Sequence, residues 1–128
     1  MDRTFVIAAA LFGFIGVAAG AFGAHALRES LSPRDLEIFE TAVRYQLVHA
    51  VALLGIASAW ARWPESAGTL ALSGWLMVGG VTVFSGSLYL LVLSGMRWLG
   101  AVTPLGGVTM LAGWAMLGWA ALRAGSSS

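Results

Sequence analysis

Residues 41–50 read TAVRYQLVHA and run directly into VALLGIASAWA, which is as apolar as a membrane-spanning helix. The polar residues at this junction are Arg44, Tyr45, Gln46 and His49. Hydrocarbon offers such side chains no partners, so within a membrane they face the interior of a helical bundle. Either this segment lies outside a membrane or other helices surround it.

The composition is that of a membrane protein. Hydrophobic residues make up 59% of the 128 residues and charged residues only 10%, whereas soluble proteins carry about 25% charged residues. Three long stretches contain no Asp, Glu, Lys or Arg: residues 4–24, 66–96 and 98–122. Each exceeds the roughly 20 residues that a helix needs to cross the hydrocarbon core. A fourth crossing, residues 41–61, reaches that length only if Arg44 and His49 lie within it.

We therefore predict an all-α fold, a single domain over residues 1–128 that forms a four-helix transmembrane bundle. The predicted helices cover residues 4–24, 33–61, 68–93 and 99–122. Ser32 as N-cap and Pro33 at the first helical position predict that the second helix begins outside the membrane. That helix would be about 43 Å long at 1.5 Å per residue, longer than one crossing. Because its polar residues point in several directions, we expect it to be central.

Four crossings place both termini on the same side of the membrane. Six of the seven arginines are divided equally between the two sides, Arg3, Arg62 and Arg123 against Arg28, Arg34 and Arg97, and the depth of Arg44 assigns it to neither. The positive-inside rule therefore leaves the orientation undetermined. A cleavable signal peptide is the alternative interpretation of residues 1–24. It is disfavoured because the apolar run is longer than the usual roughly 7–15 residues and contains several glycines.

Several function classes are excluded by what the sequence lacks. It has no cysteine, so disulfide and thiol chemistry are absent. The formal net charge of +1 supplies no basic surface for nucleic acid. No HExxH, Walker, GxSxG or paired-carboxylate pattern occurs, and we therefore expect neither catalysis nor a metal or other cofactor.

A candidate polar cluster joins the second and third predicted helices: Arg44, Tyr45, His49, Thr82, Ser85 and Tyr89. The last three share one helix face at i, i+3 and i+7. His49 lies about 12 Å beyond Thr41 at 1.5 Å per residue, close to the membrane midplane. We expect a neutral imidazole there, with Ser85 or Tyr89 as a partner. The cluster is either a set of interhelical hydrogen bonds or a pathway for a proton or small solute.

Arg44 lies nearer the membrane surface than His49. Glu40 precedes it by four residues, which is the favourable order for an ion pair on a helix. We therefore predict an interfacial ion pair between Glu40 and Arg44. The alternative is that Arg44 binds a carboxylate on another helix, an anionic ligand or a lipid headgroup.

Glycines mark two further segments. A predicted helix-packing face on the first helix contains Gly13, Gly16, Gly20 and Gly23, because small residues allow another helix to approach closely. Near the start of the fourth helix, residues 103–107 read TPLGG. This segment either breaks that helix locally or simply begins it.

Four motifs carry a family resemblance: GAFGAHALR (20–28), TAVRYQLVHAVALL (41–54), FSGSLYLL (84–91) and TPLGGVTMLAGW (103–114). Together they resemble the DUF423 family of small bacterial membrane proteins, whose eukaryotic relatives are called transmembrane protein 256. The motifs span almost the whole chain in the expected order. The resemblance implies a four-helix protein of the bacterial inner membrane and brings no established activity.

We expect an accessory, interaction or structural component of the membrane. Its partners would be the lipid bilayer and either further copies of itself, as a homo-oligomer, or a larger membrane complex. The alternative is a carrier or channel for a small solute or proton, which uses the polar cluster. Because four helices rarely enclose a pathway, that alternative requires an oligomer. A membrane enzyme ranks third, since no nucleophile–base or metal set is visible.

Overall fold

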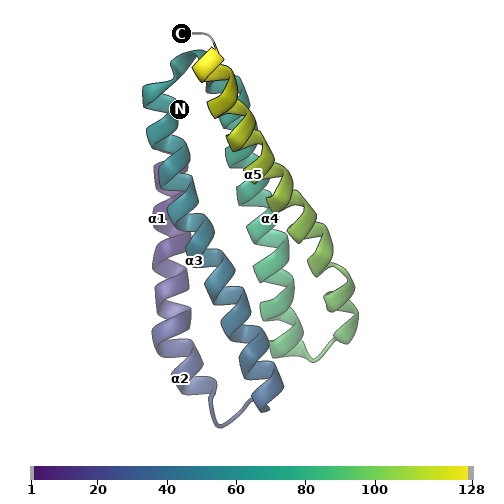
Figure 1. The fold of residues 1–128 in the computed structure, drawn as a ribbon. Coiled ribbons are helices and arrows are strands. Elements are labelled where there is room, and N and C mark those ends of the chain that lie inside the picture. Colours follow the sequence, from purple (N-terminus) through teal and green to yellow (C-terminus); the bar gives the residue numbers. More distant parts are fainter. Residues whose placement is uncertain (1, 127–128) are drawn as a thin grey trace.

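The computed structural model describes residues 2–126, and every element in that part of the chain is helical. The bounds are α1 Asp2–Ala18, a π-helical turn Ala19–Gly23, α2 Ala24–Leu27, α3 Pro33–Arg62, α4 Ala67–Ser94 and α5 Thr103–Ser126. Short 3-10 turns, Pro64–Ser66 and Arg97–Ala101, precede α4 and α5. The long helices run up and down, and α1 begins at the same end of the bundle at which α5 ends (Figure 1).

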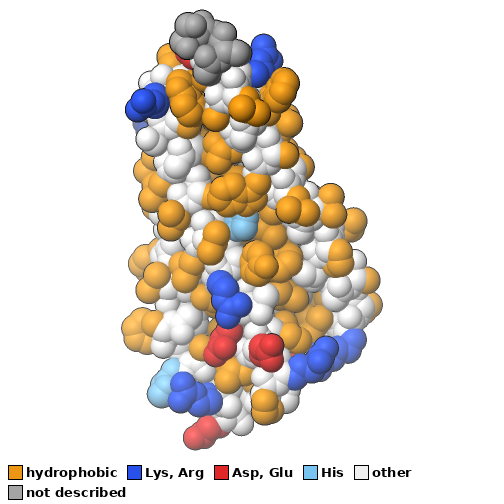
Figure 2. Space-filling view, in the orientation of Figure 1, with side chains coloured by type: hydrophobic (Ala, Val, Ile, Leu, Met, Phe, Trp, Pro, Cys, Tyr) orange, Lys and Arg blue, Asp and Glu red, His pale blue; other side chains and the backbone are white. Residues whose placement is uncertain are grey.

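Four segments of the described chain are long and apolar enough to cross a membrane: Arg3–Leu27, Pro33–Arg62, Pro64–Ser94 and Arg97–Ala124. The predicted all-α, four-helix transmembrane fold is confirmed. On the face drawn in Figure 2, hydrophobic and uncharged side chains fill a broad middle zone, and most charged side chains lie toward the two ends. This distribution suits a bundle whose middle is surrounded by lipid.

The first helix is longer than predicted. The Ala24 N–H bonds to the Ala19 carbonyl, five residues back, which is the π-helical pattern. This wider turn absorbs one extra residue, and the chain continues as helix through His25 to Leu27. The helix predicted to end at residue 24 therefore ends about one turn later, at Leu27.

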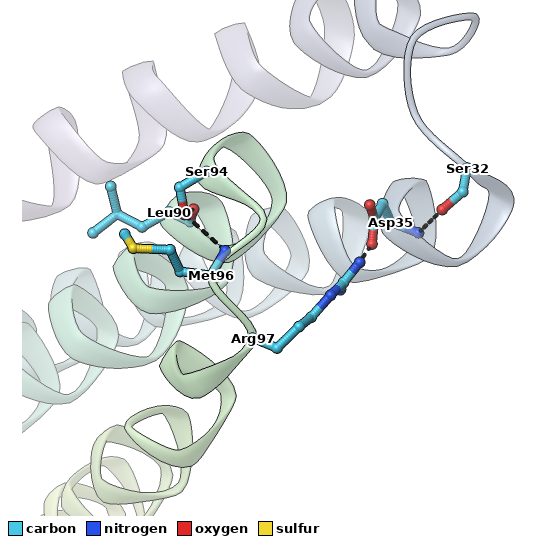
Figure 3. A network of polar contacts seen from close by, with 6 residues as sticks. All are labelled: Ser32, Asp35, Leu90, Ser94, Met96 and Arg97. Atoms are coloured by element: carbon cyan, nitrogen blue, oxygen red, sulfur yellow. Dashed lines mark hydrogen bonds and ion pairs between the residues drawn. The ribbon is translucent and has the colours of Figure 1, made fainter.

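The start of α3 is capped as predicted. The Ser32 hydroxyl accepts a hydrogen bond from the Asp35 N–H at 3.1 Å, and Pro33 occupies the first helical position. Asp35 in turn accepts a hydrogen bond from Arg97 Nη1 at 3.2 Å, which is an ion pair at the surface. These contacts link the start of α3 to the turn between α4 and α5 (Figure 3).

That turn is itself held by local hydrogen bonds. Gly95 ends α4 with a φ of 75°, a left-handed conformation that glycine adopts without steric cost. Its N–H bonds to the Leu91 carbonyl at 2.8 Å. The Ser94 hydroxyl donates to the Leu90 carbonyl and accepts from the Met96 N–H (Figure 3). The turn can therefore present Arg97 to Asp35 from a fixed position.

The helices pack in the order α1, α3, α4, α5. The predicted central helix, α3, lies between α1 and α4, but α4 is equally central because it lies between α3 and α5. Buried apolar residues form two clusters. One includes Phe5, Leu53, Ile56, Leu70 and Met77, and the other includes Phe39, Val43, Leu91, Val92 and Leu99. Along α3 and α4, the buried polar residues Gln46, His49 and Ser85 lie between the two clusters.

Three of the four predicted packing glycines on the first helix face α3. The nearest atom to a Cβ built on each is Leu47 Cδ2 at 2.6 Å for Gly16, Val43 Cγ1 at 3.0 Å for Gly20 and Phe39 Cζ at 3.2 Å for Gly23. A Cβ on Gly13 would meet nothing within 4 Å, so Gly13 does not belong to this packing face. The helical period explains this, because three residues leave Gly13 about 60° away from Gly16 around the helix axis.

The closest approach of two backbones is between α4 and α5. A Cβ on Gly106 would lie 2.5 Å from the Phe84 nitrogen and 2.7 Å from the Gly80 oxygen. A Cβ on Gly80 would lie 2.8 Å from the Met110 nitrogen. Residues 103–107 thus begin α5 and bring it against α4, and the helix is not broken there.

The neighbouring glycines Gly106 and Gly107 provide a matched test of this contact. Gly106→Ala should lower the stability of the bundle by about 1–3 kcal/mol, because the new methyl group meets backbone atoms that have no room to move. Gly107→Ala should be neutral or stabilising by up to about 1 kcal/mol, since its Cβ would meet only Phe84 Cδ2 at 3.9 Å. Thermal unfolding of the purified variants in detergent measures both. Equal unfolding temperatures would contradict the packing described.

Candidate functional site

The predicted polar cluster is divided between two sides of α3. On the side toward α1, the Gln46 amide nitrogen Nε2 donates to the Phe12 carbonyl at 2.9 Å. The Gln46 oxygen Oε1 accepts from the Tyr89 hydroxyl at 2.7 Å. Gln46 is only 4% exposed. A single buried side chain therefore connects α1, α3 and α4.

Ser85 strengthens the same side. Its hydroxyl donates to the Ala42 carbonyl at 2.7 Å, so it links α4 to α3 one turn from Gln46. Thr82 does not take part, because its hydroxyl donates to the Val78 carbonyl of its own helix and its side chain is exposed. Of the three helix-face hydroxyls that the sequence suggested, two bridge helices and one bonds locally.

His49 lies on the other side, toward α5. Its Nε2 is 3.0 Å from Trp114 Nε1, and its Nδ1 is 2.7 Å from the Tyr45 carbonyl oxygen. An indole N–H can only donate, so Nε2 must accept, and Nδ1 must carry the proton that it donates to the carbonyl. This is a neutral imidazole with both nitrogens satisfied.

The prediction that Ser85 or Tyr89 is the hydrogen-bond partner of His49 is wrong. Gln46 bonds to Tyr89 instead, because it and not His49 faces α1 and the hydroxyls of α4. Gln46 was visible in the sequence as a polar residue beside the cluster, and Trp114 was overlooked. A signal for Trp114 was present: it stands in mid-helix, far from both membrane surfaces, where an indole N–H needs an acceptor.

A groove opens between α3 and α5. Its larger part, of about 410 Å³, is lined by Tyr45 and His49 of α3, Phe84 of α4, and Pro104, Gly107, Val108, Met110, Leu111 and Trp114 of α5. An adjoining part, of about 370 Å³, is lined by Arg44, Tyr45, Val48, His49 and Trp114. We call the two parts together the α3–α5 groove. Figure 2 shows this face, where hydrophobic side chains surround a histidine at mid-height.

The predicted ion pair between Glu40 and Arg44 is not formed. Both side chains are exposed, and no hydrogen bond or ion pair connects them. An exposed pair on a helix contributes only about 0–1 kcal/mol, so little holds two long side chains together there. Arg44 instead lies at the edge of the α3–α5 groove, with Tyr45 and Val48.

The described part of the chain contains no grouping of His, Asp and Glu that could hold a metal ion. Its buried side-chain nitrogen and oxygen atoms all have hydrogen-bond partners. The buried polar residues of the described chain therefore bond to one another or to backbone carbonyls, and the α3–α5 groove is a surface hollow that another molecule could enter.

The bond between Trp114 and His49 predicts a non-additive pair of substitutions. His49→Leu should lower stability by about 1–3 kcal/mol, because it leaves the Trp114 N–H without an acceptor at a depth where lipid offers none. Trp114→Phe removes that donor. It should therefore lower the stability of the His49→Leu variant less than it lowers the stability of the parent protein. Thermal unfolding in detergent, followed by circular dichroism, compares the four proteins. A His49→Leu variant as stable as the parent would show that the bond contributes nothing.

Comparison with known proteins agrees with this architecture. Residues 19–107 match the model of a family described as "Protein of unknown function (DUF423)". The UPF0382 inner membrane protein YgdD of Escherichia coli (strain K12) is 43% identical over 129 residues, which cover 95% of this chain and 92% of the relative. The UPF0382 membrane protein YwdK of Bacillus subtilis (strain 168) is 38% identical, with 94% and 98% covered.

A further relative, the UPF0382 membrane protein SSP2132 of Staphylococcus saprophyticus, is 41% identical over 119 residues, with 90% and 93% covered. No solved structure matches this chain. The family model covers more than half of the residues, and the relatives match nearly the whole length. The chain belongs to the DUF423 family of membrane proteins.

Proposed function

We propose that this protein is a non-enzymatic accessory component of the membrane, which acts by binding another molecule of the bilayer at the α3–α5 groove. The observation that carries the proposal is the position of the groove on the outer surface of the bundle. Val108 and Leu111 line it, and their side chains are 65% and 69% exposed. A molecule dissolved in the bilayer can therefore reach it sideways, without crossing water.

Transport is less well supported. A pathway through the bundle would connect the hollow at His49 with the hollow of about 190 Å³ that Tyr89 and Gln46 line on the other side. The two hollows have no lining residue in common. The hydrogen bonds of Gln46 to Phe12 and Tyr89 also tie together the helices that a pathway would have to separate.

We further propose that the protein lies in the bacterial inner membrane with both termini on one side. The name of the relative from Escherichia coli, an inner membrane protein, supports the location. The four candidate crossings support the shared side, because α1 begins and α5 ends at one end of the bundle (Figure 1).

Single cysteines test these proposals cleanly, since the native chain has none. Val108→Cys lies in the groove, and Leu54→Cys is a control on the exposed apolar surface of α3. Neither should react with a membrane-impermeant maleimide in intact or inverted vesicles, because both face lipid. Ser30→Cys and Ser126→Cys should react from opposite faces of the membrane.

Two results would contradict the proposals. Labelling of Val108→Cys without labelling of Leu54→Cys would reveal an aqueous pathway and favour a carrier. Labelling of Ser30→Cys and Ser126→Cys from the same face would refute the four-crossing topology.

A further inference from the structure

We propose that the α3–α5 groove binds a glycerophospholipid with a phosphoethanolamine headgroup. Arg44 would bind the phosphate, Glu40 the ammonium group, and the hollow beside Tyr45 one acyl chain. This inference rests on the proposed function, because it names the molecule that the groove binds.

The larger part of the groove suits a narrow, apolar occupant. Its volume of about 410 Å³ falls within the roughly 300–1,000 Å³ of small-molecule sites. From Pro104 to Trp114 it extends about 15 Å at 1.5 Å per residue. A helix about 10 Å across would occupy roughly 1,200 Å³ over that length. A whole helix of a second copy exceeds the hollow and would place only side chains in it, whereas a flexible acyl chain can enter it.

Arg44 lies just inside the hydrocarbon boundary, from which its side chain can extend to the phosphate groups. A hydrocarbon core of about 30 Å corresponds to about 20 residues of helix. Counted back from Arg62, at the other end of α3, these residues reach Ala42. Arg44 therefore lies within about one turn of the boundary, where its long side chain can extend to the interface. Its guanidinium has five donors in a planar arrangement that matches phosphate oxygens.

Glu40 decides between headgroups. It lies one turn nearer the water, about 6 Å from Arg44 along the helix axis, and the two form no ion pair with each other. A headgroup with only negative charge would meet the carboxylate of Glu40 with repulsion. In a headgroup that has a phosphate followed by an ammonium, the phosphate would face Arg44 and the ammonium would face Glu40. The order along α3, from apolar groove to Arg44 to Glu40, is the order of chain, phosphate and amine in the bilayer.

The ammonium must also be able to donate hydrogen bonds. A primary ammonium has three N–H donors, as in lysine, and can bond to the Glu40 carboxylate. The quaternary ammonium of choline has none. Tyr45 lies beside Arg44 at the groove. Its hydroxyl bonds to no other residue in the described chain and is available to the phosphate or an ester oxygen. These features together favour phosphoethanolamine over phosphocholine and phosphoglycerol.

Native mass spectrometry of the purified protein tests the proposal. Detergent micelles would contain equal amounts of dioleoyl phosphatidylethanolamine, phosphatidylcholine and phosphatidylglycerol. The parent protein should retain phosphatidylethanolamine at least about fivefold over each of the others. Glu40→Gln should abolish the preference over phosphatidylglycerol, and Arg44→Gln should reduce the retention of all three lipids.

A pair of glycine variants separates binding from folding. Gly107→Leu places a side chain into the groove, where its Cβ meets only Phe84 Cδ2 at 3.9 Å. Gly79→Leu is the control, because its Cβ meets nothing within 4 Å and lies outside the groove. Gly107→Leu should lose bound lipid at least fivefold at an unchanged unfolding temperature, whereas Gly79→Leu should retain it.

Three results would overturn the inference: equal retention of the three lipids, full retention by Gly107→Leu, or a lipid-free dimer that Gly107→Leu dissociates. The last result would assign the groove to a second copy of the chain. If no lipid binds while Val108→Cys remains unreactive toward the maleimide, the lipid is refuted and the accessory function still stands. A reactive Val108→Cys would refute the accessory function itself.

Discussion

The hydrogen bonds of Gln46 are the interaction on which the rest of the structure depends. Hydrocarbon offers a buried amide no partner, so Gln46 must find both a donor and an acceptor inside the bundle. It finds the Phe12 carbonyl on α1 and the Tyr89 hydroxyl on α4. The small surface of Gly16 lets α1 approach, since a Cβ there would stand 3.4 Å from Gln46 Nε2. The glycine face and the buried amide thus work together to hold three helices.

The groove exists because α5 packs closely against α4 but not against α3. Gly80 and Gly106 draw α5 close against α4, and no comparable set of small residues draws it to α3. The bond from Trp114 to His49 crosses the space between α3 and α5 at mid-depth. Toward the start of α5, the rings of Tyr45 and Phe84 pack together with their centroids 4.7 Å apart, and with Pro104 they line the hollow. A tightly packed bundle can in this way keep one lipid-facing surface concave.

Much of this fold was predictable from the sequence, because the rules of the membrane are simple. Charge-free stretches predicted three of the four crossings, and Ser32 with Pro33 predicted the start of α3. The π turn at Ala19–Gly23 and the partner of His49 were not predictable. Both depend on the rotation of one helix relative to another, and a few tens of degrees decide whether Gln46 or His49 faces Tyr89. The same limit applies to Gly13, which belongs to the glycine stripe by sequence, although a Cβ added to it would meet no atom within 4 Å.

Gln46 and Tyr89 stabilise the bundle through the hydrogen bond between them. A double-mutant cycle of Gln46→Leu and Tyr89→Phe, measured as the free energy of unfolding in detergent, tests it most directly. The account predicts that each single substitution destabilises the protein. It also predicts that the double variant loses less than the sum of the two, with a coupling of about 0.6–1.7 kcal/mol, the range of interhelical hydrogen bonds in membranes. Strictly additive losses would contradict it, because the two side chains would then contribute independently and Gln46 would not be the link between α3 and α4.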